Sequence, residues 1–302
     1  MKTVICTCLA AAALILGYLP LKAATTARLE FLTAVYADDK GNGLQLPEGV
    51  ACGPNGLVVV GDTGNDRLLR FTYRNQAVDK VVAVSIPQLT APSRVQLSST
   101  GEIYALDSRQ RTIVHLGPDG QFKETLALDG VPPPATIVPK SFALDAADNL
   151  YVLDEFSGRV LVLNPQGRFQ RALQFPAGTG FETDLAVDFE GNVLLFDAIE
   201  RKIFSAAKGT GPFVQVGGDL SESVATMPTA IMVSKGLIFV AEGSGGIIDT
   251  FGRDGKFVAH LLRMGWEEGA LRHPAQLCVN DKDEVVIADR DNSRVQLFRL
   301  TR

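Results

Sequence analysis

The chain has 302 residues and a formal net charge of −5; 46% of its residues are hydrophobic and 21% are charged. This balance supports a large buried core and excludes an intrinsically disordered polymer. The mild acidity, and the lack of a dense run of Lys and Arg in the sequence, argue against a nucleic-acid-binding protein. Frequent glycine (29 residues) and few aromatic residues favour many short strands joined by tight turns.

The first residues have the layout of a secretory signal peptide. Lys2 supplies a short positive region, an almost wholly apolar run follows as far as Leu19, and small residues surround Lys22. We therefore expect cleavage after residues 1–23 and a mature protein that is periplasmic or extracellular, without insertion into a membrane. The alternative is an uncleaved N-terminal anchor, although the apolar run is shorter than the about 20 residues that a spanning helix requires.

An apolar run that ends in an acidic residue recurs six times. The gaps between successive acids are 45, 47, 43, 45 and 47 residues, and the acids are Asp62, Asp107, Asp154, Asp197, Glu242 and Asp289. A proline precedes five of these acids by 14 or 15 residues, at Pro47, Pro92, Pro139, Pro228 and Pro274. In the fourth copy, Glu182 stands in place of the proline. Each period contains four strand-like segments separated by turn residues, which is typical of β-propeller blades.

The chain ends supply one more expectation about this fold. The last copy ends at Arg302 after only three predicted strands, whereas residues 27–37 form a strand-like segment before the first copy. We predict that this N-terminal segment completes the last blade, which suppresses an exposed sheet edge. The predicted fold class is therefore all-β: a six-bladed β-propeller of four-stranded antiparallel blades, forming one monomeric domain over residues 27–302. Two unrelated all-β domains are the alternative, which the regular spacing disfavours.

Two copies resemble the NHL repeat. The first runs from Pro47 to Phe71 and contains an Asp-Thr-Gly-Asn-Asp-Arg turn, and the last runs from His273 to Phe298 and contains Asp-Arg-Asp-Asn-Ser-Arg. The resemblance spans the mature chain and is looser in the middle four copies. It implies a propeller that acts as a recognition surface, and we predict an exported module that binds a protein or a glycan. Some related six-bladed propellers are lactonases or lyases, so fold alone does not decide the function.

The repetition of the six acids around a ring indicates a structural role. A turn aspartate accepts hydrogen bonds from the backbone amides that follow it, and an arginine at the start of the next strand can pair with a carboxylate. We therefore expect the six acids to pin turns, and we predict no catalytic residue.

The loops before the prolines and the turns after the acids lie at the same end of their strands. They therefore share one face of the predicted disc, and we predict that the ligand binds there. Besides Phe156 and Arg201, this face carries the predicted ligand-binding residues Arg94, Arg109, Arg111, Lys140, Asp184, Gln276 and Trp266. Exposed Trp and Arg are enriched at binding hot spots. For Trp266 the alternative is packing as a wedge between two blades.

An enzyme is the alternative function: a lactonase-like hydrolase or a lyase with a divalent cation in the central channel. The resemblance to lactonase-like propellers implies calcium on acidic residues of the channel floor. Here only Glu48 and Asp184 are acidic at the comparable positions, and in blades one and four they would face each other across the axis. Nearby Arg94 and Lys140 oppose a cation, and no predicted inner strand carries a histidine for zinc. We therefore predict neither a metal nor another cofactor.

Removal of the signal leaves two cysteines, Cys52 and Cys278, in the innermost strands of the first and last blades. These blades are neighbours once the ring closes, so the two cysteines could form a disulfide in an oxidising compartment. Counted from the opening prolines, the two residues point to opposite faces of their sheets. Opposite faces of adjacent blades can meet, so this facing permits a disulfide, and side chains that point away from each other are the alternative. We expect free buried thiols, the default for cysteine.

Overall fold

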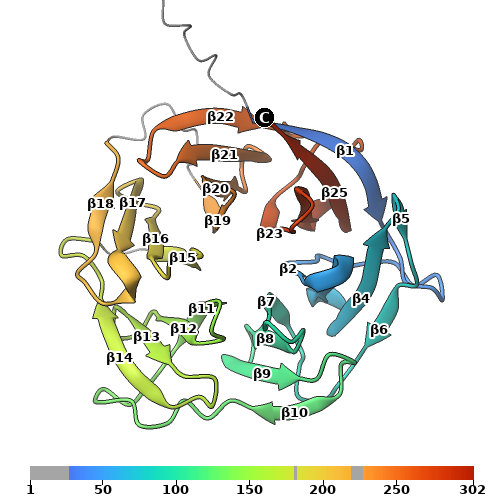
Figure 1. Ribbon diagram of the computed structural model, residues 1–302. Helices are drawn as coiled ribbons and strands as arrows, with labels where there is room; N and C mark the ends of the chain where they lie inside the picture. Colours follow the sequence, from blue (N-terminus) through green and yellow to red (C-terminus); the bar gives the residue numbers. More distant parts are fainter. Residues whose placement is uncertain (1–26, 180–181, 219–226) are drawn as a thin grey trace, which may run out of the picture.

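The computed structural model describes residues 27–179, 182–218 and 227–302, so the predicted signal segment lies outside the described residues. The described residues form six antiparallel sheets arranged as a ring around a central channel (Figure 1). The six-bladed propeller predicted from the repeat is confirmed. Within these residues, no helix has both the length and the apolar character needed to cross a membrane.

Blades 1 to 5 take their strands in chain order from the channel outward. Blade 1 has a divided outer edge and contains β2 (Gly49–Cys52), β3 (Leu57–Asp62), β4 (Arg67–Arg74), β5 (Ala77–Val78) and β6 (Val82–Val84). Blade 2 contains β7 (Pro92–Leu97), β8 (Ile103–Asp107), β9 (Thr112–Leu116) and β10 (Phe122–Thr125). Blade 3 contains β11 (Pro139–Leu144), β12 (Leu150–Asp154), β13 (Arg159–Leu163) and β14 (Phe169–Gln174). Blade 4 contains β15 (Glu182–Val187), β16 (Val193–Asp197), β17 (Lys202–Ala206) and β18 (Val214–Val216). Blade 5 contains β19 (Pro228–Ser234), β20 (Leu237–Glu242), β21 (Ile247–Gly252) and β22 (Phe257–Leu261).

Blade 6 joins the two ends of the chain. Its inner strands are β23 (Pro274–Val279), β24 (Glu284–Asp289) and β25 (Arg294–Thr301), and its outer strand is β1 (Arg28–Val35). Strand β1 pairs antiparallel with β25 along its whole length, from Arg28 opposite Thr301 to Val35 opposite Val295 (blue beside red in Figure 1). The predicted closure by the N-terminal strand is thus observed.

The core is divided among the blade junctions. Six hydrophobic clusters are present, and each combines side chains of two adjacent blades. Strands such as β8 and β16 are buried at every position, because both faces of each sheet pack against a neighbour. Burial of one large apolar side chain contributes about 1.5–3 kcal/mol, so the ring is stabilised at every junction rather than in one central core.

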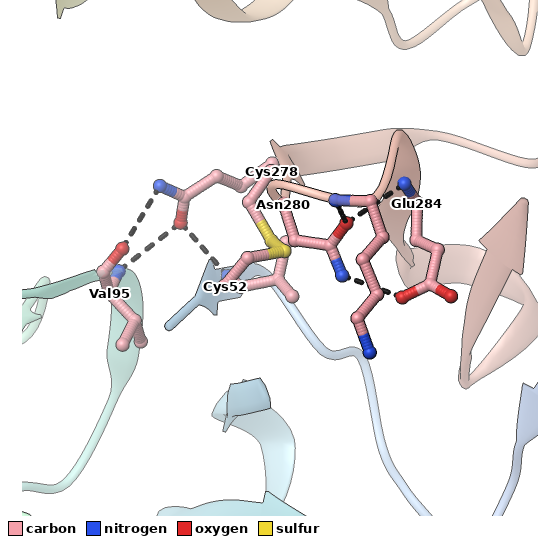
Figure 2. Close-up of a disulfide and its surroundings, with 8 residues drawn as sticks. Cys52, Val95, Cys278, Asn280 and Glu284 are labelled. Carbon is pink, nitrogen blue, oxygen red and sulfur yellow. Dashed lines mark hydrogen bonds between the residues drawn. A yellow bond between two sulfur atoms is a disulfide. The ribbon is translucent and has the colours of Figure 1, made fainter. Parts of the chain in front are cut away.

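Cys52 and Cys278 form a disulfide between β2 and β23, at the junction where the ring closes (Figure 2). Their Cα atoms lie 5.6 Å apart, a normal separation for a disulfide. The expectation of free thiols is therefore wrong. The register after the opening proline is the same in both blades, with Val50 opposite Val60 and Leu277 opposite Ile287, so the two cysteines do point to opposite faces of their sheets. Because blades 1 and 6 are adjacent, these opposite faces meet, and both cysteines pack in the cluster at that junction.

Candidate functional site

The six repeat acids, Asp62, Asp107, Asp154, Asp197, Glu242 and Asp289, are each 0% exposed. They accept hydrogen bonds from the turn that follows, as Asp107 does from the amides of Arg109 (2.9 Å) and Gln110 (2.8 Å). Among the described residues, five of them (the acids of blades 1, 2, 3, 5 and 6) are also seen to accept an amide of the loop before the inner strand, such as Thr90 N at 2.6 Å from Asp107. Burial opposes ionisation of Asp107, but the amides of Thr90 and Gln110 lower its pKa overall. The acids therefore fix the loops of one face of the disc, hereafter the loop face.

In blade 6 this arrangement holds a long loop between β22 and β23. Asp289 accepts hydrogen bonds from Arg272 N (2.6 Å), Asn292 Nδ2 (2.9 Å) and Arg294 Nε (2.7 Å). The buried Arg294 also donates to the carbonyls of Glu267 (2.7 Å) and Ala270 (2.9 Å). Burial disfavours its charged form, but the bond to Asp289 raises the pKa of Arg294 overall. The loop is thus bound at several points to the repeat motif.

Trp266 lies in this loop and is 72% exposed. The alternative of a wedge between two blades is therefore wrong. The guanidinium carbon of Arg272 lies 3.8 Å from the centroid of the Trp266 ring, in cation–π contact. Arg272 was not predicted from the sequence, because nothing in its spacing shows that its side chain folds back over Trp266.

Exposed apolar side chains gather on the loop face. Among the described residues, eleven large hydrophobic side chains are exposed, and six of them lie in loops of this face: Tyr36, Phe156, Ile199, Met227, Met264 and Trp266. Phe189 alone lies in a turn of the opposite face, between β15 and β16, and the other four lie on outer strands. Of these six side chains, only Phe156 and Trp266 were predicted for this face from the sequence. The repeat register could have placed the other four on this face, but not shown their exposure.

Three predicted ligand-binding residues lie inside the channel instead of on the exposed face. Asp184 is only 4% exposed and accepts hydrogen bonds from Ser141 Oγ and from Ile231 N (3.0 Å). Arg94 donates to the carbonyl of Thr229 (2.6 Å), and its Nε lies 3.8 Å from Asp184 Oδ1. Burial raises the pKa of Asp184, against the lowering effect of Arg94. These contacts link blades 2, 3, 4 and 5 across the channel.

Gln276 completes this polar layer. Its Oε1 accepts hydrogen bonds from Val50 N (3.0 Å) and Val95 N (3.2 Å), and its Nε2 donates to Val95 O (3.2 Å). It therefore links blade 6 to blades 1 and 2, beside the disulfide (Val95, Cys52 and Cys278 are labelled in Figure 2). A cavity of about 160 Å³ lies between the inner strands and is lined in part by Gln276, Asp184 and both cysteines.

The structure gives Glu48 and Asp184 separate partners. Glu48 pairs with Arg290 at 2.9 Å, whereas Asp184 takes part in the buried network of the channel. The site does not fit a calcium ion. The positively charged Arg94 lies beside Asp184, and the carboxylate oxygens of Asp184 already accept hydrogen bonds from Ser141 and Ile231. Over the described ranges, no three His, Cys, Asp or Glu side chains are grouped so that they could hold a metal ion.

The remaining predicted residues lie on the loop face. Arg109 is exposed and 3.4 Å from Asp66, Lys140 pairs with Glu155 at 2.9 Å, and Arg111 is exposed. Exposed pairs of this kind contribute little to stability, typically about 0–1 kcal/mol.

Comparison with protein-family models identifies one of the repeats. Residues 271–298 match the family model of the NHL repeat. Blade 6 carries an NHL repeat. This match covers β23, β24 and most of β25, including Asp289, Asn292 and Arg294, which hold the Trp266 loop. No curated protein matches the chain by sequence.

Solved structures match over most of the propeller. A streptogramin B lyase is 13% identical with a TM-score of 0.63, covering 91% of this chain and 98% of that chain. A gluconolactonase from Xanthomonas campestris is 15% identical with a TM-score of 0.66, covering 92% and 91%. A chain of a nidogen/laminin complex is 14% identical with a TM-score of 0.60, covering 78% and 93%. At these identities the likeness shows the fold alone.

Proposed function

We propose that this NHL-repeat propeller is an exported, monomeric binding module that holds a partner protein on its loop face. The observation that carries the proposal is the distribution of exposed apolar side chains among the described residues, with six in loops of that face and one in a turn of the opposite face. Aromatic residues, Met and Arg are enriched at the centres of protein interfaces. The six buried acids give these loops fixed positions, which lowers the entropic cost of binding.

The kind of exposed side chain favours a protein over a glycan. Met227, Met264 and Ile199 present alkyl and thioether surface, which suits apolar side chains of another protein. A glycan ligand remains an outcome that the experiment below distinguishes. One structural neighbour comes from a complex between two proteins, which supports this use of the fold as an analogy.

Export is supported by two features. The N-terminal pattern is that of a signal peptide. In addition, the Cys52–Cys278 disulfide is of a kind that persists in oxidising compartments such as the periplasm or the cell exterior. Catalysis by Glu48 and Asp184 draws no support from the geometry, because each carboxylate has its own partner.

The test is capture of ligands from the envelope and secreted fractions of the native host. The wild type is compared with a loop-face variant, Phe156→Ala with Ile199→Ala, and with the matched opposite-face variant Phe189→Ala. We expect one protein to be retained by the wild type and by Phe189→Ala and to be lost from the loop-face variant. Equal retention by all three proteins, or retention of glycan alone, would contradict the proposal.

A further inference from the structure

The guanidinium of Arg272 lacks a carboxylate partner. Among the described residues, none accepts a hydrogen bond from it or forms an ion pair with it, and it lies over the ring of Trp266. Arg272 is half-buried, and its guanidinium nitrogens are not among the buried polar atoms without a partner, so they reach solvent beside the indole. A guanidinium has five N–H donors in a planar fork that matches a carboxylate.

Each acidic side chain close to Arg272 along the loop is already engaged. Glu267 pairs with Arg263 and accepts Trp266 N at 3.1 Å, and Glu268 accepts the hydroxyl of Tyr36 at 2.9 Å.

Two further acids form ion pairs with Arg290, whose Nε lies 2.9 Å from Glu48 and whose Nη1 lies 2.7 Å from Asp291. None of these acids hydrogen-bonds to the Arg272 side chain or forms an ion pair with it, so its guanidinium donors stay open to a ligand.

The backbone around this pair is rigidly held. Arg272 N donates to the buried Asp289 at 2.6 Å, and Arg272 O accepts Asp291 N at 3.1 Å. On the Trp266 side, Gly265 N donates to Leu271 O at 3.1 Å, so the two ends of the loop are joined. A binding partner would meet an ordered Trp–Arg pair and would pay little conformational entropy for it.

We propose that Trp266 and Arg272 form an anchor site for an acidic segment of the partner protein. A carboxylate of the segment binds the Arg272 guanidinium through two parallel hydrogen bonds, and a neighbouring apolar side chain covers the exposed face of the indole. The occupant is a peptide segment because it supplies a carboxylate and an apolar group within one or two residues. This inference rests on the proposed function and names the partner chemistry of its face.

The test uses a displayed library of short random peptides without tryptophan, selected on the wild-type protein. Synthetic copies of the selected peptides are then titrated while the emission of Trp266, the only tryptophan, is recorded. We expect Asp or Glu next to an apolar residue in the selected peptides. Arg272→Gln should weaken binding about tenfold to a hundredfold, the usual range for a lost charge-assisted hydrogen bond. Arg253→Gln, which alters an arginine of the opposite face, should leave binding unchanged.

A double-mutant cycle makes the assignment specific. Changing the peptide acid to its amide should weaken binding to the wild type but have little further effect on Arg272→Gln. Additive effects, or selected peptides without an acid, would overturn the inference. If peptides bind and are lost only in Phe156→Ala with Ile199→Ala, the anchor site is wrong but the loop-face function stands. If no peptide is selected, both fail. Unchanged thermal unfolding of each variant verifies that it is folded.

Discussion

Arg253 and Arg272 each lie over an exposed aromatic ring, on opposite faces of the propeller, and they differ in their charge partners. On the opposite face, the Arg253 guanidinium carbon lies 5.1 Å from the centroid of Phe189 and pairs with Asp188 at 2.8 Å and Glu190 at 3.0 Å. On the loop face, Arg272 covers Trp266 and has no such pair among the described residues. The first pair is satisfied within its own chain. The second presents both an apolar surface and an unpaired charge, which are what a partner can use.

The Trp266–Arg272 pair and the Phe189–Arg253 pair also differ in the acids that hold their loops. Replacement of these acids should give the largest difference in the free energy of unfolding. Asp289→Asn should lower the free energy of unfolding by about 3–5 kcal/mol, because it leaves the buried charge of Arg294 without its partner. It should also free the Trp266 loop and lower the fluorescence anisotropy of the tryptophan. The same change on the opposite face, Asp188→Asn, should cost less, about 1–2 kcal/mol, and leave that anisotropy unchanged, because Asp188 is buried but its partner Arg253 is exposed and keeps Glu190. Equal costs at the two sites, measured by urea denaturation, would remove the distinction.

The disulfide stabilises the ring without belonging to either pair. Replacement of both Cys52 and Cys278 by serine should lower the free energy of unfolding by about 2–4 kcal/mol, because the disulfide restricts the unfolded chain. Trp266 emission should stay the same, since the disulfide lies at the channel. Reductant should lower the Tm of the wild type to that of the variant and leave the variant unaffected. An unchanged Tm in both cases would show that the thiols do not pair in solution.

Low pH should weaken the pairing of Asp188 with Arg253 on the opposite face. Burial raises the pKa of Asp188, but hydrogen bonds from Asn192 and Arg253 outweigh it, so its folded-state pKa lies below the ordinary 3.8. A lowered pKa means that Asp188 contributes stability above pH 3.8 and loses this contribution as the pH falls through the folded-state value. Denaturation at pH 7 and below pH 3.8 should therefore show a smaller acid-induced loss in Asp188→Asn than in the wild type, by up to about 1 kcal/mol. A loss of equal size would argue that Asp188 is not stabilised by its partners.

Replacement of Trp266, the proposed binding residue, should have the smallest effect on the stability of the protein. Trp266→Ala should change the free energy of unfolding by less than about 1 kcal/mol, since an exposed cation–π contact contributes only about 0.5–1 kcal/mol. Phe189→Ala is the matched control and should behave alike. A cost of several kcal/mol at Trp266, seen in thermal or urea unfolding, would instead indicate a packing role.

The fold could be predicted from the sequence because each blade repeats the same local pattern. The spacing of Asp62, Asp289 and the acids between them set the blade count, and the strand missing after Arg302 predicted the closure by β1. These signals are local or periodic. The sequence could not show that Asp62 and its equivalents also bind the loop before their own blade.

The interior of the channel could not be predicted, for a geometric reason. Arg94 contacts Thr229, and Gln276 contacts Val95, in blades far away along the chain. Whether such side chains face solvent or one another depends on how close the inner strands lie at the axis. The repeat in the sequence carries no information about that distance. The Cys52–Cys278 disulfide depends on which sheet faces meet at the closure, and the stacking of Arg272 on Trp266 depends on the course of one loop.

Quenching of the single tryptophan tests the central claim most directly, because it requires no ligand. Iodide and caesium ions are compared at one constant ionic strength, with acrylamide as the neutral reference. The charge nearest the indole is the Arg272 guanidinium, which has no ion-pair partner among the described residues. Iodide should therefore quench Trp266 more strongly than caesium, and Arg272→Gln should abolish this preference while Arg253→Gln leaves it intact. Weak quenching by all three agents, or an iodide preference that survives Arg272→Gln, would contradict the assignment of Trp266 and Arg272 as an exposed, unpaired site.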